Sequence, residues 1–520
     1  MNDRDKIKKL EPVKRPAQHS QRQSYRRKKD SNRLRLVVTL VALVLIAAGT
    51  SIYFFSKSSP SATNPAKTTT TKASVVTTEP QPVWRVSWTT PMAWGHGTAA
   101  NSTIRDLATV EAAGTSIKIR ISNEFGTGPL DIGAATVGIE SIGPAISPGT
   151  LQNLTFSGSA AVSIPIAQSI VSDPVQLSTT TGETIAISLY VANVDLMTVH
   201  YCCSGHTLAY YTRNNIGDTV NDLTGSTFNG GATNYGILVD AIDSLETTGR
   251  GSIVVLGDSI SDGYHSALRW PDVLQARINA LPDQDHRAVV DESITANTLT
   301  TFTPNFSKGG GGPPGLTRLD DDVLSLPGVS YLIVFLGTND IFFGAPPSLI
   351  ESGYQQVVSQ AHQQGIKVIG ATLLPRLGSD YLLNGTYYRL WDSAHESELE
   401  QLNQWILTSR SFDAVLNFNI VVANIYNGAC QPDAMYPQYD STDHLHPNAS
   451  GQVALGNSID TQIFDIQPAP LASPLISVTR TPGCQGEPGL LPASTTTQPA
   501  PVTTAAAPVI PTTNVPPIEK

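Results

Sequence analysis

The sequence predicts an α/β fold: a three-layer domain whose parallel sheet is flanked by helices, preceded by an antiparallel β-sandwich domain and one N-terminal transmembrane helix. Three observations lead to this prediction. Residues 36–55 carry no charge and follow a basic tail, which is typical of a membrane span. Apolar residues alternate at every second position in runs between 83 and 245, and from Ser252 short apolar runs alternate with helical patterns.

The N-terminal segments come first. Residues 1–35 hold 13 Lys and Arg against 4 Asp and Glu. The twenty residues without a charge that follow match the roughly 30 Å hydrocarbon core of a bilayer in length. The basic flank predicts a cytoplasmic N-terminus, so we expect a single-pass membrane protein whose remaining chain is extracellular. A cleaved signal peptide is the competing interpretation. The apolar stretch exceeds a usual signal core, however, and residues 52–55 are a poor approach to a cleavage site.

Composition sets the remaining boundaries. Residues 56–82 and 467–520 are rich in Ser, Thr, Pro and Ala, and we expect both to be disordered. Residues 83–245 are expected to form the β-sandwich, because period-two alternation is clear at 116–121 and 184–191.

Residues 246–466 are expected to form the α/β domain. Short apolar strands separated by helices indicate a parallel sheet that is covered on both faces. The predicted strands are 252–256, 330–336, 366–373 and 414–418, and the predicted helices are 270–281, 348–364 and 396–409.

Charge and cysteine content exclude some partners. After residue 35 the chain carries 20 basic and 39 acidic side chains, which argues against nucleic acid as a partner. The cysteines Cys202, Cys203, Cys430 and Cys484 fit an oxidising compartment, but their pairing cannot be deduced. No spacing resembles a zinc site, and we expect neither a metal nor a cofactor. The sequence does not indicate a protein partner.

The residues that could carry chemistry lie in the α/β domain. Ser259 follows the predicted strand 252–256 in a Gly-Asp-Ser turn, and Asp443 and His446 lie three residues apart much further along. Open α/β sheets place their chemistry at the carboxyl ends of strands. We therefore expect Ser259 as the nucleophile, His446 as its base and Asp443 as the carboxylate that orients the base. Acyl transfer also needs oxyanion donors, for which the Asn339 side chain and the Ser259 N–H are candidates.

These motifs resemble those of the GDSL, or SGNH, hydrolase superfamily, in which separate blocks supply Ser, Gly, Asn and His. Residues 257–260 resemble the first block, 337–340 the third, and Asp443 with His446 the last. The resemblance implies the same catalytic roles and an oxyanion donor at Asn339.

The resemblance extends over roughly 83–465. Residues 121–126 and 172–175 resemble the segment that precedes the catalytic domain in a bacterial subgroup described as lysophospholipase-like. The second block departs from the family pattern, because Ala296 stands where a glycine N–H usually completes the oxyanion hole. An alanine N–H can serve if φ is negative, whereas a positive φ penalises the Cβ.

Each motif also has a non-catalytic interpretation. The Gly-Asp-Ser sequence could be a simple turn, Asn339 and Asp340 could cap a helix, and residues 443–446 could form a surface loop or a weak metal site. Arg318 with 320–322 is expected to form a charged helix face, and His200 is expected to be structural.

The expected function is that of an extracellular, membrane-anchored serine esterase whose substrate is a small-molecule or glycan ester, such as an O-acetyl glycan. A lysophospholipase or lipase is the first alternative. The second is a cell-surface binding protein with impaired catalysis, for which Ala296 is the argument.

Overall fold

The computed structural model describes residues 81–465, with gaps at 201–207, 247–248, 301–310, 384–385 and 427. The basic tail 1–35, the predicted span 36–55, almost all of the linker 56–82 and the tail 467–520 lie outside the described residues, so these predictions stay untested. No helix in the described part has the length and hydropathy needed to cross a bilayer. Cys430 is disulfide-bonded.

Two antiparallel sheets form the N-terminal part, as predicted. The first has the order β1 (Val83–Thr89), β14 (Val239–Glu246), β4 (Ile117–Ser122), β9 (Ser169–Val171). The second has the order β13 (Gly231–Thr233), β12 (Leu208–Tyr211), β3 (Ala99–Val110), β10 (Glu183–Val194), β5 (Leu130–Ile142), β6 (Ala145–Ile146), with β7 (Gln152–Asn153) and β8 (Val162–Ile164) also paired to β5. β2 (Trp94–Gly95) pairs with β11 (Thr198–Val199).

The core between these sheets follows from period-two alternation. Ile117, Ile119 and Ile121 on β4 and Ile185 and Ile187 on β10 are fully buried in one cluster. Side chains of successive strand residues point to opposite faces, so the alternating isoleucines all face inward. The strands predicted at 116–121 and 184–191 are confirmed.

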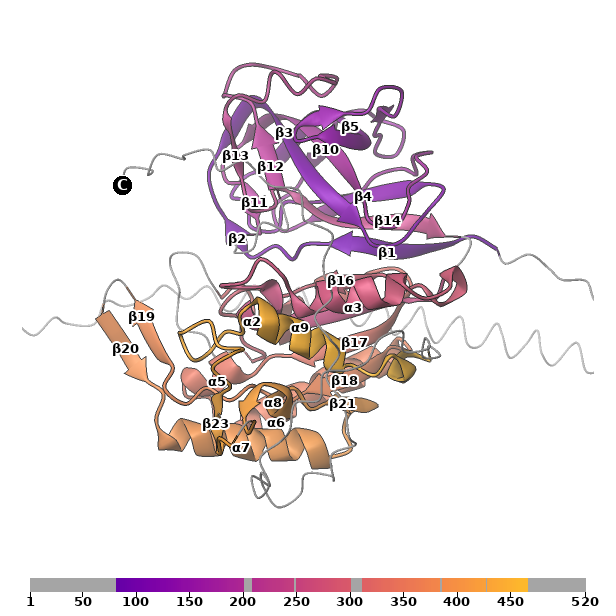
Figure 1. Cartoon of the computed structure of the whole chain (residues 1–520). Coiled ribbons are helices and arrows are strands. Elements are labelled where there is room, and N and C mark those ends of the chain that lie inside the picture. The colour runs from indigo at the N-terminus through magenta and orange to yellow at the C-terminus, as the bar shows by residue number, and fades with distance from the viewer. Residues whose placement is uncertain are drawn as a thin grey trace, which may run out of the picture. The chain divides into compact units, whose positions relative to one another are not determined.

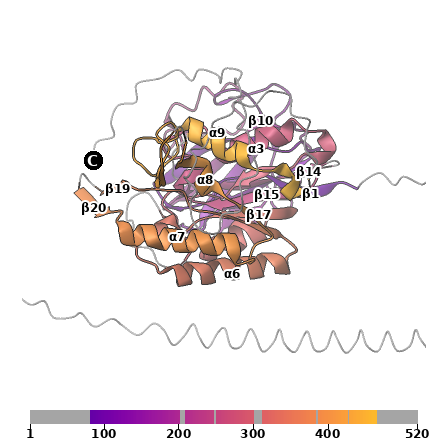
Figure 2. The same ribbon diagram turned by 60° about the horizontal axis from the view of Figure 1, so that its bottom comes forward.

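The second part contains the predicted parallel sheet, with the order β16 (Val289–Asp291), β15 (Ser252–Gly257), β17 (Val329–Phe335), β18 (Lys367–Ala371), β21 (Ala414–Leu416). Figure 2 shows β15 and β17 between two pairs of helices: α3 (Trp270–Asn279) with α9 (Ala449–Ser458), and α6 (Pro347–Gln363) with α7 (Ser393–Thr408). Coverage on both faces explains why the strands are uniformly apolar. The three-layer arrangement is therefore observed.

The remaining elements are short. They are α2 (Ser259–Asp262), η1 (Asp283–Asp285), α4 (Gly315–Leu319), η2 (Asp320–Leu324), α5 (Thr338–Phe342), β19 (Asp380–Leu383), β20 (Thr386–Leu390), α8 (Phe418–Val422), β22 (Ala423–Asn424), β23 (Gln431–Met435) and η3 (Thr461–Phe464).

The strand order fixes where a site can form. β15 comes first in the parallel sheet, the next strand along the chain lies on one side of it, and all later strands lie on the other side. Where the strand order reverses in this way, a crevice forms at the carboxyl ends of the two strands on either side of the reversal point. These strands are β15 and β17, and the turns that follow them carry Ser259 and Asn339.

β1 links the antiparallel and parallel parts and lies between the other antiparallel strands and β16 (Figure 1). The Ser252 hydroxyl donates to the Val86 carbonyl at 2.7 Å, and the Val86 N–H donates to the Pro327 carbonyl at 2.9 Å. Val86 is fully buried in the core of the parallel sheet. The two parts therefore share a core and backbone hydrogen bonds.

Candidate active site

The serine turn is shaped by a glycine and an aspartate. β15 ends at Gly257, where an added Cβ would lie 2.5 Å from the Ser293 hydroxyl and 2.7 Å from the Ser261 hydroxyl, so no larger residue fits. Asp258 caps α2, because its side chain accepts from the Ile260 N–H at 3.0 Å. Ser259 therefore begins a helical turn directly beyond the carboxyl end of β15.

Two helices hold this turn in place. The indole N–H of Trp270 on α3 donates to the Ser261 hydroxyl at 3.0 Å. Gln452 on α9 donates to the Ile260 carbonyl at 2.9 Å and accepts from the Trp270 backbone N–H at 2.9 Å. Both side chains are fully buried, so the turn is fixed by contacts within the core.

The structure brings the three predicted catalytic residues together. The Oγ atom of Ser259 lies 2.8 Å from Nε2 of His446, and Nδ1 of His446 lies 2.5 Å from Oδ2 of Asp443. An ionised carboxylate only accepts hydrogen bonds, so Nδ1 carries the hydrogen and Nε2 is left to accept the serine proton. The other carboxylate oxygen of Asp443 accepts from the N–H groups of Leu445 and His446 at 3.0 and 2.9 Å.

Burial favours the neutral form of His446, and the interaction with His446 favours the ionised form of Asp443. Burial lowers the pKa of His446; the Asp443 carboxylate opposes this effect, and the nearby charges of His265 and Arg376 add to it. Burial raises the pKa of Asp443, but the hydrogen bond and charge of His446 outweigh it and hold that pKa below its ordinary range. A neutral imidazole beside an ionised carboxylate is the protonation state that a general base needs.

Asn339 joins the serine turn to the segment that contains Ala296. It lies on α5, which begins after Gly337, a residue at a φ of 121° that favours glycine. The Asn339 side chain is buried, and its Nδ2 donates to the Asn297 carbonyl at 2.9 Å and to Oδ2 of Asp258 at 3.4 Å. The amide thus lies at the serine turn, as the sequence predicts, and also anchors the neighbouring segment.

Ala296 has the positive φ that penalises its Cβ. Its φ is 60°, in the left-handed region, which costs an L-residue about 1–2 kcal/mol. Among the described residues its N–H donates to no partner, and neither does the Ser259 N–H at the start of α2. Both N–H groups are therefore able to donate to another group.

Asp340 supports the site in a way that the sequence did not indicate. Its Oδ2 accepts from the Leu299 N–H at 2.8 Å, and its Oδ1 accepts from the N–H and hydroxyl of Thr300 at 2.9 and 2.8 Å. Asp340 is fully buried, so it fixes the backbone that follows Ala296 rather than capping α5.

Arg318 departs from the expected charged helix face. Arg318 and Asp322 are buried and form an ion pair at 2.7 Å, and the guanidinium also donates to Oδ1 of Asn297 at 3.1 Å. Asp320 and Asp321 are exposed, as expected. The spacing of four residues between Arg318 and Asp322 was the only available signal of their pairing.

His265, Asp443 and His446 are the one group of described residues with a geometry that could hold a metal ion, since their ligand atoms lie within 4.8 Å of one another. Asp443 and His446 already bond each other, and His446 also bonds Ser259, so this arrangement fits a proton relay. His444 is not part of the group, because its Nδ1 lies 2.6 Å from Oδ2 of Asp440.

Residues 255–454 match the model of the GDSL-like Lipase/Acylhydrolase family. No curated protein matches the chain in sequence. The similar solved structures include an acetyl xylan esterase from Geobacillus stearothermophilus, with 13% identity over 43% of this chain and 99% of that one and a TM-score of 0.32. A GDSL-like lipase from Bacteroides thetaiotaomicron has 18% identity over 41% of this chain and 88% of that one, with a TM-score of 0.30.

The family match covers the turn that carries Ser259, the turn that carries Asn339, and the loop with Asp443 and His446. It confirms the predicted superfamily and class of enzyme: residues 255–454 form a domain of the GDSL-like lipase/acylhydrolase family, and the chain is a GDSL-type esterase.

Proposed function

We propose that the enzyme transfers an acyl group from its substrate first to Ser259 and then to water. The observation that supports this mechanism is the unbroken row of hydrogen bonds from Ser259 through His446 to Asp443, with distances of 2.8 and 2.5 Å. A serine hydroxyl is a weak nucleophile until a positioned base removes its proton.

Both steps use the same residues. The Ser259 oxygen attacks the ester carbonyl while its proton passes to Nε2 of His446. The bond to the alcohol then breaks, the imidazolium returns the proton to the leaving alkoxide, and an acyl ester remains on Ser259. Water attacks this ester with His446 again as base, which releases the carboxylic acid and restores Ser259. The Asp443 carboxylate stabilises the imidazolium in each step.

The oxyanion of each tetrahedral intermediate needs fixed donors. The unpaired N–H groups of Ser259 and Ala296 supply two. The Asn339 amide lies at the serine turn and can be the third when its Nδ2 exchanges the 3.4 Å hydrogen bond to Asp258 for the oxyanion. Such donors act only once charge develops on the carbonyl oxygen, so they accelerate the chemical step more than they tighten substrate binding.

The surroundings of His446 support a polar substrate, in our proposal an O-acyl and especially an O-acetyl group on an extracellular glycan. The Tyr264 ring lies 4.8 Å from the His446 ring and is partly exposed, which provides an aromatic face beside the base. His265 and the buried Arg376 are the charged or polar neighbours of His446. An aromatic face with polar neighbours suits a sugar better than a long acyl chain, which needs an extended apolar surface.

The proposed location rests on sequence alone. The basic tail 1–35 and the apolar segment 36–55 support a single membrane span with the catalytic domain outside the cell.

A fluorophosphonate probe that reacts with activated serines tests the mechanism. We expect it to label the purified protein and not the Ser259→Ala variant. Equal absence of labelling in both would support the alternative of a binding protein with impaired catalysis.

A series of model esters tests the substrate. We expect the highest kcat/KM for the acetyl ester, with Ser259→Ala as the control for non-enzymatic hydrolysis. A clear preference for long acyl chains would reject the glycan proposal and support a lysophospholipase or lipase.

A further inference from the structure

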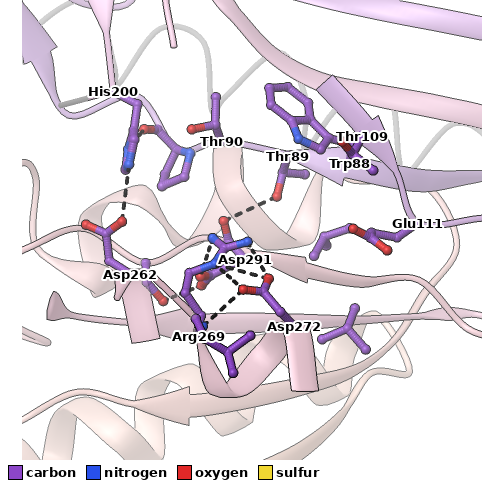
Figure 3. Close-up of a pocket in the computed structure, with 15 residues that line it drawn as sticks. Trp88, Thr89, Thr90, Thr109, Glu111, His200, Asp262, Arg269, Asp272 and Asp291 are labelled. Carbon is purple, nitrogen blue, oxygen red and sulfur yellow. Dashed lines mark hydrogen bonds and ion pairs between the residues drawn. The ribbon is translucent and has the colours of Figure 1, made fainter. Parts of the chain in front are cut away.

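A cavity of about 330 Å³ lies between the antiparallel strands and the turns of the parallel sheet. One wall carries Trp88, Thr89 and His200, and the opposite wall carries Asp262 and Arg269 (Figure 3). At one end of the cavity the His200 ring reaches across to Asp262, so a residue of the antiparallel part contacts the helix that begins with Ser259.

His200 is held on its own side by two hydrogen bonds. Its Nδ1 lies 2.8 Å from the Pro91 carbonyl, and its backbone N–H donates to the Gly236 carbonyl at 3.1 Å. A carbonyl only accepts, so Nδ1 carries a hydrogen, and the ring orientation is fixed. Nε2 then lies 3.5 Å from Oδ1 of Asp262, and both side chains are buried. Because a carboxylate only accepts, an attraction between these two atoms requires that Nε2 carry a hydrogen as well as Nδ1.

Asp262 connects His200 to the segment that contains Ala296. It is the last residue of α2, and its Oδ2 accepts from the Thr295 N–H at 3.0 Å and from the Thr295 hydroxyl at 2.8 Å. Thr295 directly precedes Ala296, whose φ of 60° is unfavourable for alanine. An unfavourable backbone conformation persists only where its surroundings hold it in place.

We propose that His200, Asp262 and Thr295 form a positioning relay by which the antiparallel part fixes the Ala296 N–H in the oxyanion hole. His200 and Asp262 are positioning residues in this relay and do not contact the substrate. The proposal rests on the proposed acyl-transfer function, and it gives the antiparallel part a role in the rate of the reaction.

Arg269 also interacts electrostatically with Asp262, but its hydrogen bonds go to other carboxylates. Its guanidinium pairs with Asp272 at 2.7 Å and with Asp291 at 3.1 Å. Arg269 thus forms ion pairs with two other carboxylates. Asp262 is the carboxylate that lies within 4 Å of Nε2 of His200 (Figure 3).

The test uses the purified full chain with His200→Leu, which removes the ring nitrogens, and His200→Gln, which keeps a side-chain N–H. Asp262→Asn is a near-isosteric second variant, in case His200→Leu does not fold. Ser252→Ala is the matched control, because it removes a different hydrogen bond between the two parts, from Ser252 to the Val86 carbonyl.

For His200→Leu and Asp262→Asn we expect kcat for an acetyl ester to fall about tenfold, with KM changed less than about twofold, because the loss of a whole oxyanion donor costs roughly 100- to 1000-fold. The double variant should be no slower than the slower single variant, because both changes break one relay. His200→Gln should recover part of kcat, and Ser252→Ala should stay within about twofold of wild type.

Amide hydrogen exchange provides a readout that does not depend on activity. We expect the Thr295 amide to lose protection in His200→Leu while the β15 amides keep theirs. Wild-type kcat and Thr295 protection in both His200→Leu and Asp262→Asn would overturn the relay, as would an equal loss of kcat in Ser252→Ala. Failure of the proposed function looks different: the wild type would then show no hydrolysis that depends on Ser259.

Discussion

Replacing Ala296 with glycine should stabilise the protein, which is the opposite of the usual result. At a φ of 60° an L-residue costs about 1–2 kcal/mol, a penalty that glycine avoids. Glycine in turn loses about 0.5–1 kcal/mol more conformational free energy than alanine on folding. The difference predicts that Ala296→Gly raises the free energy of unfolding by about 0–1.5 kcal/mol, with a midpoint of about 0.75 kcal/mol.

Urea unfolding of the purified variants measures this difference, and two other alanines provide matched controls. Ala167 is exposed in the antiparallel part at a φ of 57°, so Ala167→Gly should give a similar gain. Ala276 is exposed within α3, so Ala276→Gly should lose about 1 kcal/mol.

The kinetics of Ala296→Gly test the role of the backbone. Glycine keeps the N–H, so kcat for an acetyl ester should stay within about twofold of wild type, as it should for Ala167→Gly. A loss of stability like that of Ala276→Gly would refute the left-handed conformation. A tenfold fall in kcat with unchanged stability would show that the Ala296 methyl group, rather than its N–H, serves the reaction.

The remaining predictions concern charge and hydrogen bonding. Asp443→Asn should lower kcat about 10,000-fold in ester hydrolysis, because the amide favours the wrong His446 tautomer. Asn339→Ala should lower kcat roughly 100- to 1000-fold, with a much smaller change in KM, if its amide is an oxyanion donor. The lowered pKa of His446 should place the acid limb of kcat/KM below about pH 6.5, and His265→Ala should move the limb upward by removing a charge that lowers this pKa. Burial, with the nearby acidic side chains, raises the pKa of Glu124 from 4.5 to about 8, so its folded form holds a proton that the unfolded chain releases. Its stabilising contribution is present below pH 4.5 and is lost as the pH rises through 8; in unfolding experiments across this range Glu124→Gln should lose less stability than wild type.

The sequence predicted the parallel sheet because its signals are local. The four apolar residues before Gly257 are all fully buried, and each predicted strand and helix of the α/β part has a counterpart whose ends differ by a few residues. β16 was missed because it has only three residues, too few for periodicity to show. α9 was missed because small residues dominate it and give it little amphipathic pattern.

Local sequence signals also predicted Ser259, Asp443 and His446, but not the buried polar residues that hold the neighbouring backbone. Ser259 follows a recognisable strand and turn, and Asp443 and His446 are close in sequence, so residue type and spacing were enough to predict them. The burial of Arg318 depends on Asn297 and Asp322, and that of Asp340 depends on Leu299 and Thr300. These partners come together only once the chain has folded. From the sequence alone, a charged residue without a visible partner is therefore expected at the surface.

The oxyanion segment is therefore the part of the site that depends most on distant residues. Asn339 and Asp340 hold it from α5, Arg318 holds it from α4, and Asp262 holds it from α2. These elements all belong to the α/β part, so an antiparallel part that only buttressed the sheet would leave the site unchanged when altered. The contact between His200 and Asp262 leads us to expect the opposite. Substitutions in the antiparallel part should then change kcat through the position of the Ala296 N–H, while the hydrogen bonds from Ser259 to Asp443 stay intact.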